Sequence, residues 1–583
     1  MPPQLQPQQG PVQESVNLLG GAYEARSYIA NAQRCVNLYP ERNPEDAEAP
    51  FTHYLTPGLN LQVIPPLVAA GRGLYTATNG FLYYVVGDRV LFIDSNFVVA
   101  VLGQLEDNLS TPVKMVDNGD SIILVDGTAK GYAIELETNA FAKINDPSFL
   151  GGDNVDYLDT FFVTDQPDSR NFYASLSNVT FAQLTQVGKI LTGAITDGGS
   201  GYTDGVYNAV ALSGGTGTGA TADITVAGGI VTVVTIVDGG LDYAVSDVLS
   251  SSAIGAGSNF AWTVSTVQDV AFDPNYVAAK TGFPDKLATL LVVHREIWLF
   301  GIVKTTEVWY NAGGTNFPFQ IIPGVFIEHG AVAKYSPAKH DLLVFWLGID
   351  AEGQGTVYMG GDYTAKKIST PAIAYEFTKY SRIDDAIGMM YKQTDHVFYM
   401  LTFPTANKTW VYDLSEGLWH ERVWTDPDSG EENRHRANCI ALAYGKVLCG
   451  DWENGNLYIM DLETYNDNGA PLVRRRGMPH LVRGLARRSY GKFRASMECG
   501  DGITADPTTQ PKITLRISRN RGRTFVNAPT QTMGLEGEYD VVPTWSQLGM
   551  SRDLVFELLW SDDINTALNG AYVDVTDTVS PGT

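Results

Sequence analysis

A strand–turn–strand unit recurs along this chain. Each copy has an apolar run, a tight turn and a second run with aromatic residues that often closes on Asp, as in Phe81–Asp94 and Val447–Leu462. Self-similarity at a period of tens of residues predicts a repeat architecture, because one such unit cannot bury its own apolar face. Since the units are strand-like, the repeat favours an all-β fold built on a β-propeller.

The spacing of the copies shows where the repeat is interrupted. One gap of 133 residues contains a segment rich in Gly, Thr, Ser, Ala and Val at 188–268, and removing those 81 residues leaves 52, as in neighbouring gaps. We therefore predict a propeller of six or seven blades at 71–187 and 269–466, with a Gly-rich β domain inserted in one loop at 188–268. The copies lie near residues 75, 115, 157, 290, 342, 389 and 440.

The predicted insertion repeats internally. Ile195–Gly205 (ITDGGSGYTDG) is echoed by Ile236–Asp247 (IVDGGLDYAVSD). The Asp-Gly-Gly triplets suggest either calcium loops or tight turns. Turns are favoured, because neither segment has the alternating oxygen ligands of an EF-hand-type site.

The two ends of the chain differ from the repeats. Residues 1–15 are rich in Pro and Gln and predict a flexible arm, and residues 16–70 predict an extended strap with several prolines. After residue 466 the repeats stop. Strand-like runs at 511–575 then predict a terminal β-sandwich-like domain within 467–583.

Composition limits the partners and the compartment. The 583-residue chain has a net charge of −25, which disfavours broad adhesion to nucleic acid or anionic membrane. No signal peptide and no apolar run long enough to span a membrane is evident, so we expect a protein without membrane insertion. The sparse cysteines predict reduced thiols in a protein made in a cytoplasm: Cys35, Cys439, Cys449 and Cys499.

The sequence offers no catalytic motif. The eight His are isolated, adjacent carboxylates such as Asp384 and Asp385 face opposite sides of a strand, and no nucleophile elbow, P-loop or dinucleotide fingerprint occurs. We therefore expect a non-enzyme without cofactor or metal. Ser518–Phe525 (SRNRGRTF) resembles the Asp-box turn of β-hairpins, with Asn520 in place of the Asp.

A basic stretch stands out against the acidic background. Eight cations occupy 21 positions with no acid between them, and they are the candidate contact residues of this chain. Three interpretations remain open: phosphate contact with DNA, a salt-bridged interface with acidic neighbouring subunits, or a strand edge protected by charge. The eight are Arg474, Arg475, Arg476, Arg483, Arg487, Arg488, Lys492 and Arg494.

Several long motifs resemble one family. Thr305–Ile373, which includes TTEVWYNAGG and LLVFWLGID, is similar to the most distinctive stretch of the packaged-DNA stabilisation proteins of short-tailed bacteriophages (podoviruses), also called tail hub or nozzle proteins. AQRCVNLYPE near the start, RRRGMPHL at 474–481 and the closing β domain resemble the same family. The similarity covers nearly the whole chain except the insertion.

The resemblance implies a virion structural protein of the tail. Such proteins form a homohexameric ring below the portal and adaptor ring, prolong the DNA channel, retain packaged DNA and dock tail fibres or spikes. Double-stranded DNA would then pass without sequence-specific contact. Six copies would carry a net charge of about −150, six times −25, and like charge would keep DNA from adhering to the wall.

Two other functions compete with this one. A propeller glycosidase or capsule depolymerase of a phage tail would need two carboxylates about 5–9 Å apart. A WD-repeat scaffold would show G-H and W-D dipeptides at a fixed period, and the chain lacks that set.

Overall fold

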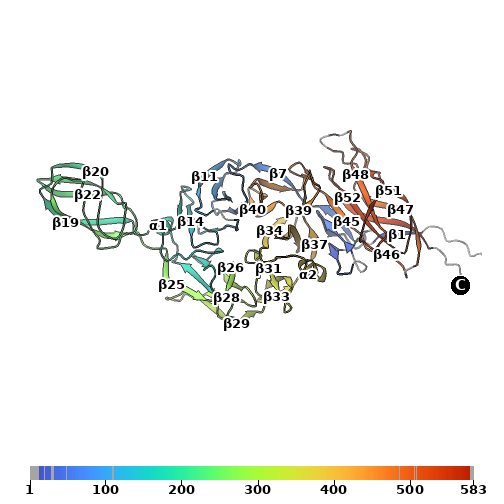
Figure 1. Ribbon diagram of the computed structural model, residues 1–583, viewed down its shortest axis with the longest axis horizontal. Coiled ribbons are helices and arrows are strands. Elements are labelled where there is room, and N and C mark those ends of the chain that lie inside the picture. The colour runs from blue at the N-terminus through green and yellow to red at the C-terminus, as the bar shows by residue number, and fades with distance from the viewer. Residues whose placement is uncertain are drawn as a thin grey trace, which may run out of the picture.

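The computed structural model describes residues 12–577 apart from 17, 19, 28–31, 48, 108–109, 485, 504–505 and 507. The molecule is elongated, with the inserted domain at one end, the propeller in the middle and the C-terminal domain at the other end (Figure 1). It is almost entirely β, as the sequence predicts. The helices of the described part are α1 (Phe181–Thr185) and α2 (Pro371–Phe377), and neither could span a membrane.

Consecutive four-stranded antiparallel units make up the central body. Five of them are separate sheets, and two are parts of larger sheets. The first three units are β8–β11 (Gly71–Thr76, Leu82–Val86, Arg89–Ile93, Val99–Gln104), β12–β15 (Lys114–Asp117, Ser121–Val125, Gly131–Glu135, Phe141–Lys143) and β16–β18 with β25 (Val155–Leu158, Phe161–Asp165, Asn171–Ser175, Phe272–Ala279). Two more are β26–β29 (Leu287–Val293, Glu296–Gly301, Thr306–Asn311, Phe319–Ile327) and β30–β33 (Ala338–His340, Leu343–Ile349, Gly355–Gly361, Thr364–Lys367). The last two are β34–β37 (Ile387–Gln393, His396–Phe403, Lys408–Asp413, Leu418–Glu421) and β40–β42 (Ala437–Ala443, Lys446–Asp451, Leu457–Asp461) with β7 (Gly58–Val63).

The first strand of each unit contacts the first strand of the next, and the ring closes on itself. The contacts run from β8 through β12, β16, β26, β30, β34 and β40 back to β8. Apolar clusters fill the space between adjacent sheets, such as Trp298 and Phe300 packed against Trp346. Each sheet therefore buries its apolar face on its neighbour, which is the packing expected of a propeller.

The strap predicted at 16–70 supplies strands as well as connections. Its β7 pairs antiparallel with β42 and becomes the outermost strand of the last unit, with Leu59 opposite Met460. The ring is thus closed by a strand from the opposite end of the chain. Residues 1–11 of the predicted arm lie outside the described residues, whereas Val12–Val16 form β1, which pairs with β53 (Leu568–Asp577).

Two packed sheets form the C-terminal domain. One contains β5 (Leu38–Arg42), β6 (Phe51–Leu55), β53, β47 (Arg488–Met497) and β51 (Thr544–Ser551), joined by β1. The other continues the β34–β37 sheet through β4 (Cys35–Val36), β45 (Arg474–Gly477), β52 (Asp553–Trp560), β48 (Lys512–Ser518) and β49 (Val526–Asn527). Phe493 of the first sheet and Phe556 of the second meet with ring centroids 4.7 Å apart. Short strands complete the junction and the domain: β2 (Tyr23–Glu24), β3 (Ala32–Gln33), β38 (Val423–Thr425), β39 (Glu432–Arg434), β43 (Asn466–Asp467), β44 (Ala470–Pro471), β46 (Leu481–Val482) and β50 (Gln531–Thr532).

The segment between β18 and β25 builds its own two sheets and its own core. The sheets are β19–β24–β23 and β20–β21–β22, and the core includes Ile224, Phe260 and Trp262. The Asp-Gly-Gly triplets form turns: Asp197 accepts from the amide of Gly199 at 2.8 Å, and Asp238 accepts from Gly240 at 3.0 Å. The strands are β19 (Ile190–Ser200), β20 (Gly205–Ala211), β21 (Thr221–Ala227), β22 (Ile230–Asp238), β23 (Val248–Leu249) and β24 (Ser258–Val267).

The base of this segment is a closed pair of strands. Ile190 is opposite Val267, and the amide of Gln268 donates to the carbonyl of Lys189 at 2.8 Å. Because the two ends already lie side by side, replacing residues 190–267 by two glycines should leave the propeller folded, with its melting temperature within about 4 °C of the full chain. Circular dichroism melts would measure this.

A matched deletion provides the control. Removing β25 takes away the outermost strand of a sheet together with buried Phe272, so this shortened chain should unfold at a clearly lower temperature. If the chain without 190–267 lost its cooperative transition, the insertion would be an integral part of the propeller.

Candidate functional site

The basic stretch does not form one surface. It runs through β45, β46 and β47, in which successive side chains point to opposite faces. In β45 this alternation buries Arg474 and Arg476 and leaves Arg475 partly exposed on the other face. The stretch is therefore divided between the interior and the surface of the domain.

Arg474 and Arg476 have no exposed surface and bond within the chain. Arg474 donates to the carbonyls of Tyr465 and Asp562, each at 2.8 Å. Arg476 donates to Nε2 of His53 at 2.9 Å and to the carbonyl of Gly20 at 2.9 Å. Burial lowers the pKa of Arg474 to about 10 and also lowers that of Arg476. The prediction that these two residues contact DNA or another subunit is wrong, because their guanidinium groups are enclosed by the chain itself.

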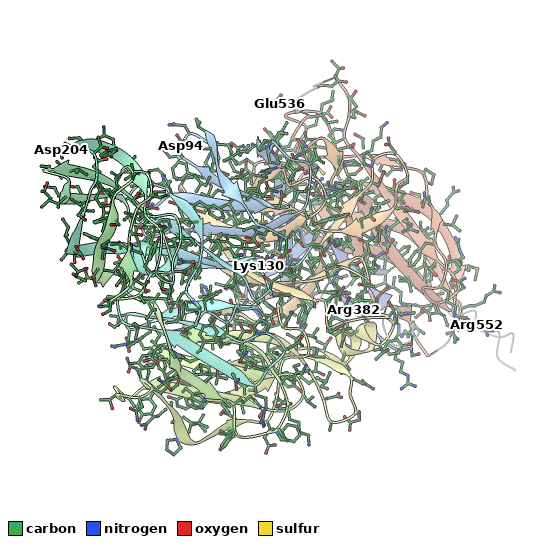
Figure 2. All side chains as sticks on the ribbon, turned by 60° about the vertical axis from the view of Figure 1, so that its left-hand side comes forward. Asp94, Lys130, Asp204, Arg382, Glu536 and Arg552 are labelled. Atoms are coloured by element: carbon green, nitrogen blue, oxygen red, sulfur yellow. The ribbon has the colours of Figure 1, made fainter. Side chains whose placement is uncertain are left out.

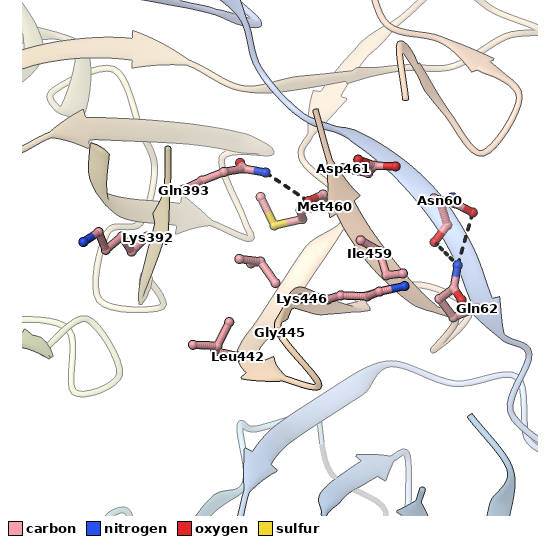
Figure 3. Close-up of a pocket in the computed structure, with 11 residues that line it drawn as sticks. Asn60, Gln62, Lys392, Gln393, Leu442, Gly445, Lys446, Ile459, Met460 and Asp461 are labelled. Atoms are coloured by element: carbon pink, nitrogen blue, oxygen red, sulfur yellow. Dashed lines mark hydrogen bonds between the residues drawn. The ribbon is translucent and has the colours of Figure 1, made fainter. Parts of the chain in front are cut away.

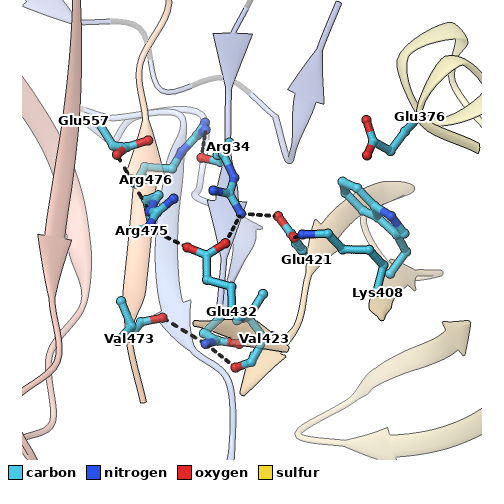
Figure 4. Close-up of polar contacts among 12 residues, drawn as sticks. Arg34, Glu376, Lys408, Glu421, Val423, Glu432, Val473, Arg475, Arg476 and Glu557 are labelled. Carbon is cyan, nitrogen blue, oxygen red and sulfur yellow. Dashed lines mark hydrogen bonds and ion pairs between the residues drawn. The ribbon is translucent and has the colours of Figure 1, made fainter. Parts of the chain in front are cut away.

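Arg475 belongs to a chain of ion pairs at the junction of propeller and C-terminal domain (Figure 4). Its guanidinium lies 2.6 Å from Glu432, whose second oxygen is 3.0 Å from Arg34. Arg34 also pairs with Glu421 at 2.7 Å. The pairs extend at the two ends to Lys408 on Glu421 and to Glu557, which also pairs with Arg516. We call these residues the junction network; it joins β36, β37, the strap, β39, β45, β52 and β48.

Burial and ion pairing shift the pKa values of the acids in the junction network in opposite directions. Burial alone would raise the pKa of Glu421, but Arg34 and Lys408 outweigh it and lower that pKa to about 2. For Glu432, too, Arg34 and Arg475 outweigh burial, so its pKa is lowered. Both carboxylates are therefore held ionised, and each cation of the network has a fixed partner.

The other basic residues are divided between local ion pairs and exposed positions. Arg488 pairs with Glu14 of β1 and, at 2.9 Å, with Asp577 of β53. Arg494 forms a two-pronged pair with Asp574, with both distances 3.0 Å. Arg483 is exposed and reaches Asp577 at 3.0 Å, and Arg487 and Lys492 are also exposed. Of the eight candidates, these three present the most surface to an outside partner.

Sequence reasoning missed the acids of this region. Glu14, Glu421, Glu432, Glu557, Asp574 and Asp577 come from segments far from residues 474–494. The only sequence signal was the basic run itself, which shows an excess of charge but not where the compensating charge lies.

A groove lies between the last two propeller units (Figure 3). It has a volume of about 460 Å³ and is lined by residues of β7, β34, β40, β41 and β42. The side-chain amide nitrogen of Gln393 donates to the backbone carbonyl of Met460 at 3.1 Å. The side-chain oxygen Oε1 of Gln393 is buried and has no hydrogen-bond partner within the described part of the chain. Asp461 is the only carboxylate among the lining residues, which are Asn60, Gln62, Lys392, Gln393, Leu442, Gly445, Lys446, Val447, Ile459, Met460 and Asp461. The groove therefore lacks the carboxylate pair that glycoside hydrolysis uses.

Comparison with known protein families gives a match that lies mostly on the propeller. The family model described as "Bacteriophage P22 Gp10, beta-propeller" matches residues 246–465, from the last part of the inserted domain through β42. The match confirms the family resemblance and the β-propeller fold class predicted from the sequence. No curated protein matches the chain.

Solved structures give more distant similarities. The computationally designed Ika8 protein is 9% identical over 69% of this chain and 100% of its own, with a TM-score of 0.32. The N-terminal domain of Nup159 is 8% identical over 74% and 99%, with a TM-score of 0.31. Virginiamycin B lyase from Staphylococcus aureus is 10% identical over 69% and 97%, with a TM-score of 0.30. Scores this low support no conclusion about this chain.

The junction network generates a prediction about acid stability. The pKa of Glu421 in the folded chain, about 2, is below the ordinary value of 4.5. Its ionisation therefore stabilises the fold above about pH 4.5, and this contribution is lost as pH falls toward 2. Glu421→Gln should lower the free energy of unfolding at pH 7 by about 3–5 kcal/mol, because Arg34 and Lys408 lose a buried partner.

Urea unfolding at pH 7 and pH 3 would measure this effect, with exposed Asp428→Asn as the control. The gap between Glu421→Gln and the parent chain should shrink at pH 3, whereas the control should match the parent at both. A gap of equal size at both pH values would contradict the assignment.

Proposed function

We infer that this chain belongs to the bacteriophage packaged-DNA stabilisation family and is a structural protein of a phage tail. The observation that carries this inference is the family match over residues 246–465, which falls on the propeller. The fold alone would leave the function open, since propellers host many activities. The match and the motifs of Thr305–Ile373 point to the same family.

We further propose that six copies form a ring below the portal and adaptor ring, prolonging the DNA channel and retaining packaged DNA. The build of the chain supports such a role. The closed ring of sheets, the strand β7 supplied from the N-terminal part and the junction network tie propeller, strap and C-terminal domain together. The net charge of −25 per chain suits a wall along which DNA slides without sequence-specific contact.

The inserted domain is our candidate for docking tail fibres or spikes. It lies at the far end of the molecule, where Figure 2 labels Asp204. Residues 190–267 contain six Asp and no Lys, Arg or Glu. Its strands also expose apolar side chains, with Val206 66% and Val237 56% exposed. An acidic, partly apolar surface at a tip is suited to a partner with a basic face.

The competing proposal is a tail glycosidase or capsule depolymerase. The groove of Figure 3 does not favour it, because Asp461 is its only carboxylate and also accepts hydrogen bonds from Glu463 and Thr464. Two carboxylates about 5–9 Å apart would be required.

The mass of the protein in solution separates these proposals. One chain has a mass of 63.4 kDa, so six copies give about 380 kDa. We expect mass photometry to find a species near that value and negative-stain images to show rings. A monomer that releases reducing sugar from capsule polysaccharide would overturn the structural role.

A further inference from the structure

Four arginines surround one open groove at the end of the C-terminal domain. Arg487, Arg519, Arg521 and Arg552 are all exposed and line a cavity of about 430 Å³ together with Met550, Ser551 and Asp553. We call this the arginine groove. Figure 2 shows Arg552 at the end of the molecule opposite Asp204 of the inserted domain. Four cations against one acid make the groove strongly basic in a chain that is acidic overall.

The turn that carries two of these arginines is held by the side chains of Ser518 and Asn520. The amide of Gly522 donates to the Ser518 hydroxyl at 2.9 Å, and the amide of Thr524 donates to Oδ1 of Asn520 at 2.9 Å. These polar residues hold the turn, as the Asp-box pattern predicts. Arg519 and Arg521 occupy the positions between them and point to the groove.

Three arginines of the groove, Arg519, Arg521 and Arg552, are incompletely neutralised. Arg521 lies 3.7 Å from Asp553, but the same carboxylate already bonds His480 at 2.7 Å. Arg519 donates to the carbonyl of Leu548 at 2.7 Å, which supplies no charge. Arg552 has no ion pair within the described part of the chain. The groove is therefore suited to a ligand that brings carboxylates or phosphates.

A complementary surface is present on the same domain. Residues 535–540 form an exposed acidic loop with Glu536, Glu538 and Asp540, in which Tyr539 is 72% exposed. Glu538 shapes the turn by accepting from the amide of Leu535 at 2.8 Å. Glu536 and Asp540 form no ion pair in the part of the chain that the structure describes. Figure 2 shows Glu536 and Arg552 well apart, so one copy cannot satisfy its own groove with this loop.

We propose that the acidic loop of one copy docks into the arginine groove of a second copy, head to tail. Arginine forks bind carboxylates in two-pronged pairs, and Met550, 45% exposed in the groove, offers an apolar contact for Tyr539. A contact between two different patches is heterologous, and repeated copies of it close into a ring when the rotation permits. This proposal rests on the ring proposed above, and it identifies the residues that would hold neighbouring copies of that ring together. The apolar pair of Tyr539 and Met550 favours this protein partner over DNA.

Charge reversal tests the contact. The groove variant is Arg521→Glu with Arg552→Glu, and the loop variant is Glu536→Arg with Asp540→Arg. Each alone places like charges together and should weaken self-association about tenfold or more, as measured by analytical ultracentrifugation. An equimolar mixture of the two variants should assemble again, because alternating copies restore opposite charges at every contact. One chain carrying all four changes should also assemble.

The matched control reverses two exposed acids on another hairpin, Asp428→Arg with Glu431→Arg, and should assemble like the parent chain. The proposal is overturned if either variant alone assembles normally, if the mixture stays dissociated although both variants keep the parent circular dichroism spectrum, or if the control dissociates equally. Normal assembly of the groove variant with lost retention of double-stranded DNA on a filter would instead make the groove a phosphate site. A monomeric parent chain would refute the proposed ring itself. A parent chain that forms the ring, with variants that assemble normally, would refute only the proposed contact.

Discussion

The junction network is the constraint on which the arrangement of this molecule depends. Glu421 ends the last strand of a propeller unit, and the sheet continues from it through Val36 of the strap to β45 and β52 of the C-terminal domain. Arg34 bridges Glu421 to Glu432 at this point. Ionised groups removed from water are tolerated only when their partners are in place, so this site favours one docking of the two domains over others.

Strand pairings between distant parts of the chain also fix the arrangement of the two domains. β7, from the N-terminal part of the chain, pairs with β42 in the last propeller unit. β1 pairs antiparallel with β53 in the C-terminal domain. Neither the propeller nor the C-terminal domain is therefore complete without strands from residues 12–63. A chain tied together in this way presents its surfaces at fixed positions, with the inserted domain at one end and the C-terminal domain at the other (Figure 1).

The repeat could be predicted from the sequence because it is local. Alternating apolar strands and turn residues repeat at a period of tens of residues, which is visible in the sequence. The Ser518–Phe525 pattern likewise indicated a turn from residues close together in the chain. The basic run was misjudged for Arg474 and Arg476 because their partners are non-local: His53 is more than 400 residues away. The strand at Gly58–Val63 carried a usable signal, since Leu59, Leu61 and Val63 alternate with polar residues. Only the fold could show that its partner is β42.

The most direct test of the account is a cryo-electron microscopy reconstruction of the assembled tail that contains this protein. We expect a closed ring of identical chains around the DNA path, with the inserted domains projecting from it and the C-terminal domains in mutual contact. A tail in which this chain sits singly, away from the DNA path and with polysaccharide in the groove beside Asp461, would contradict it.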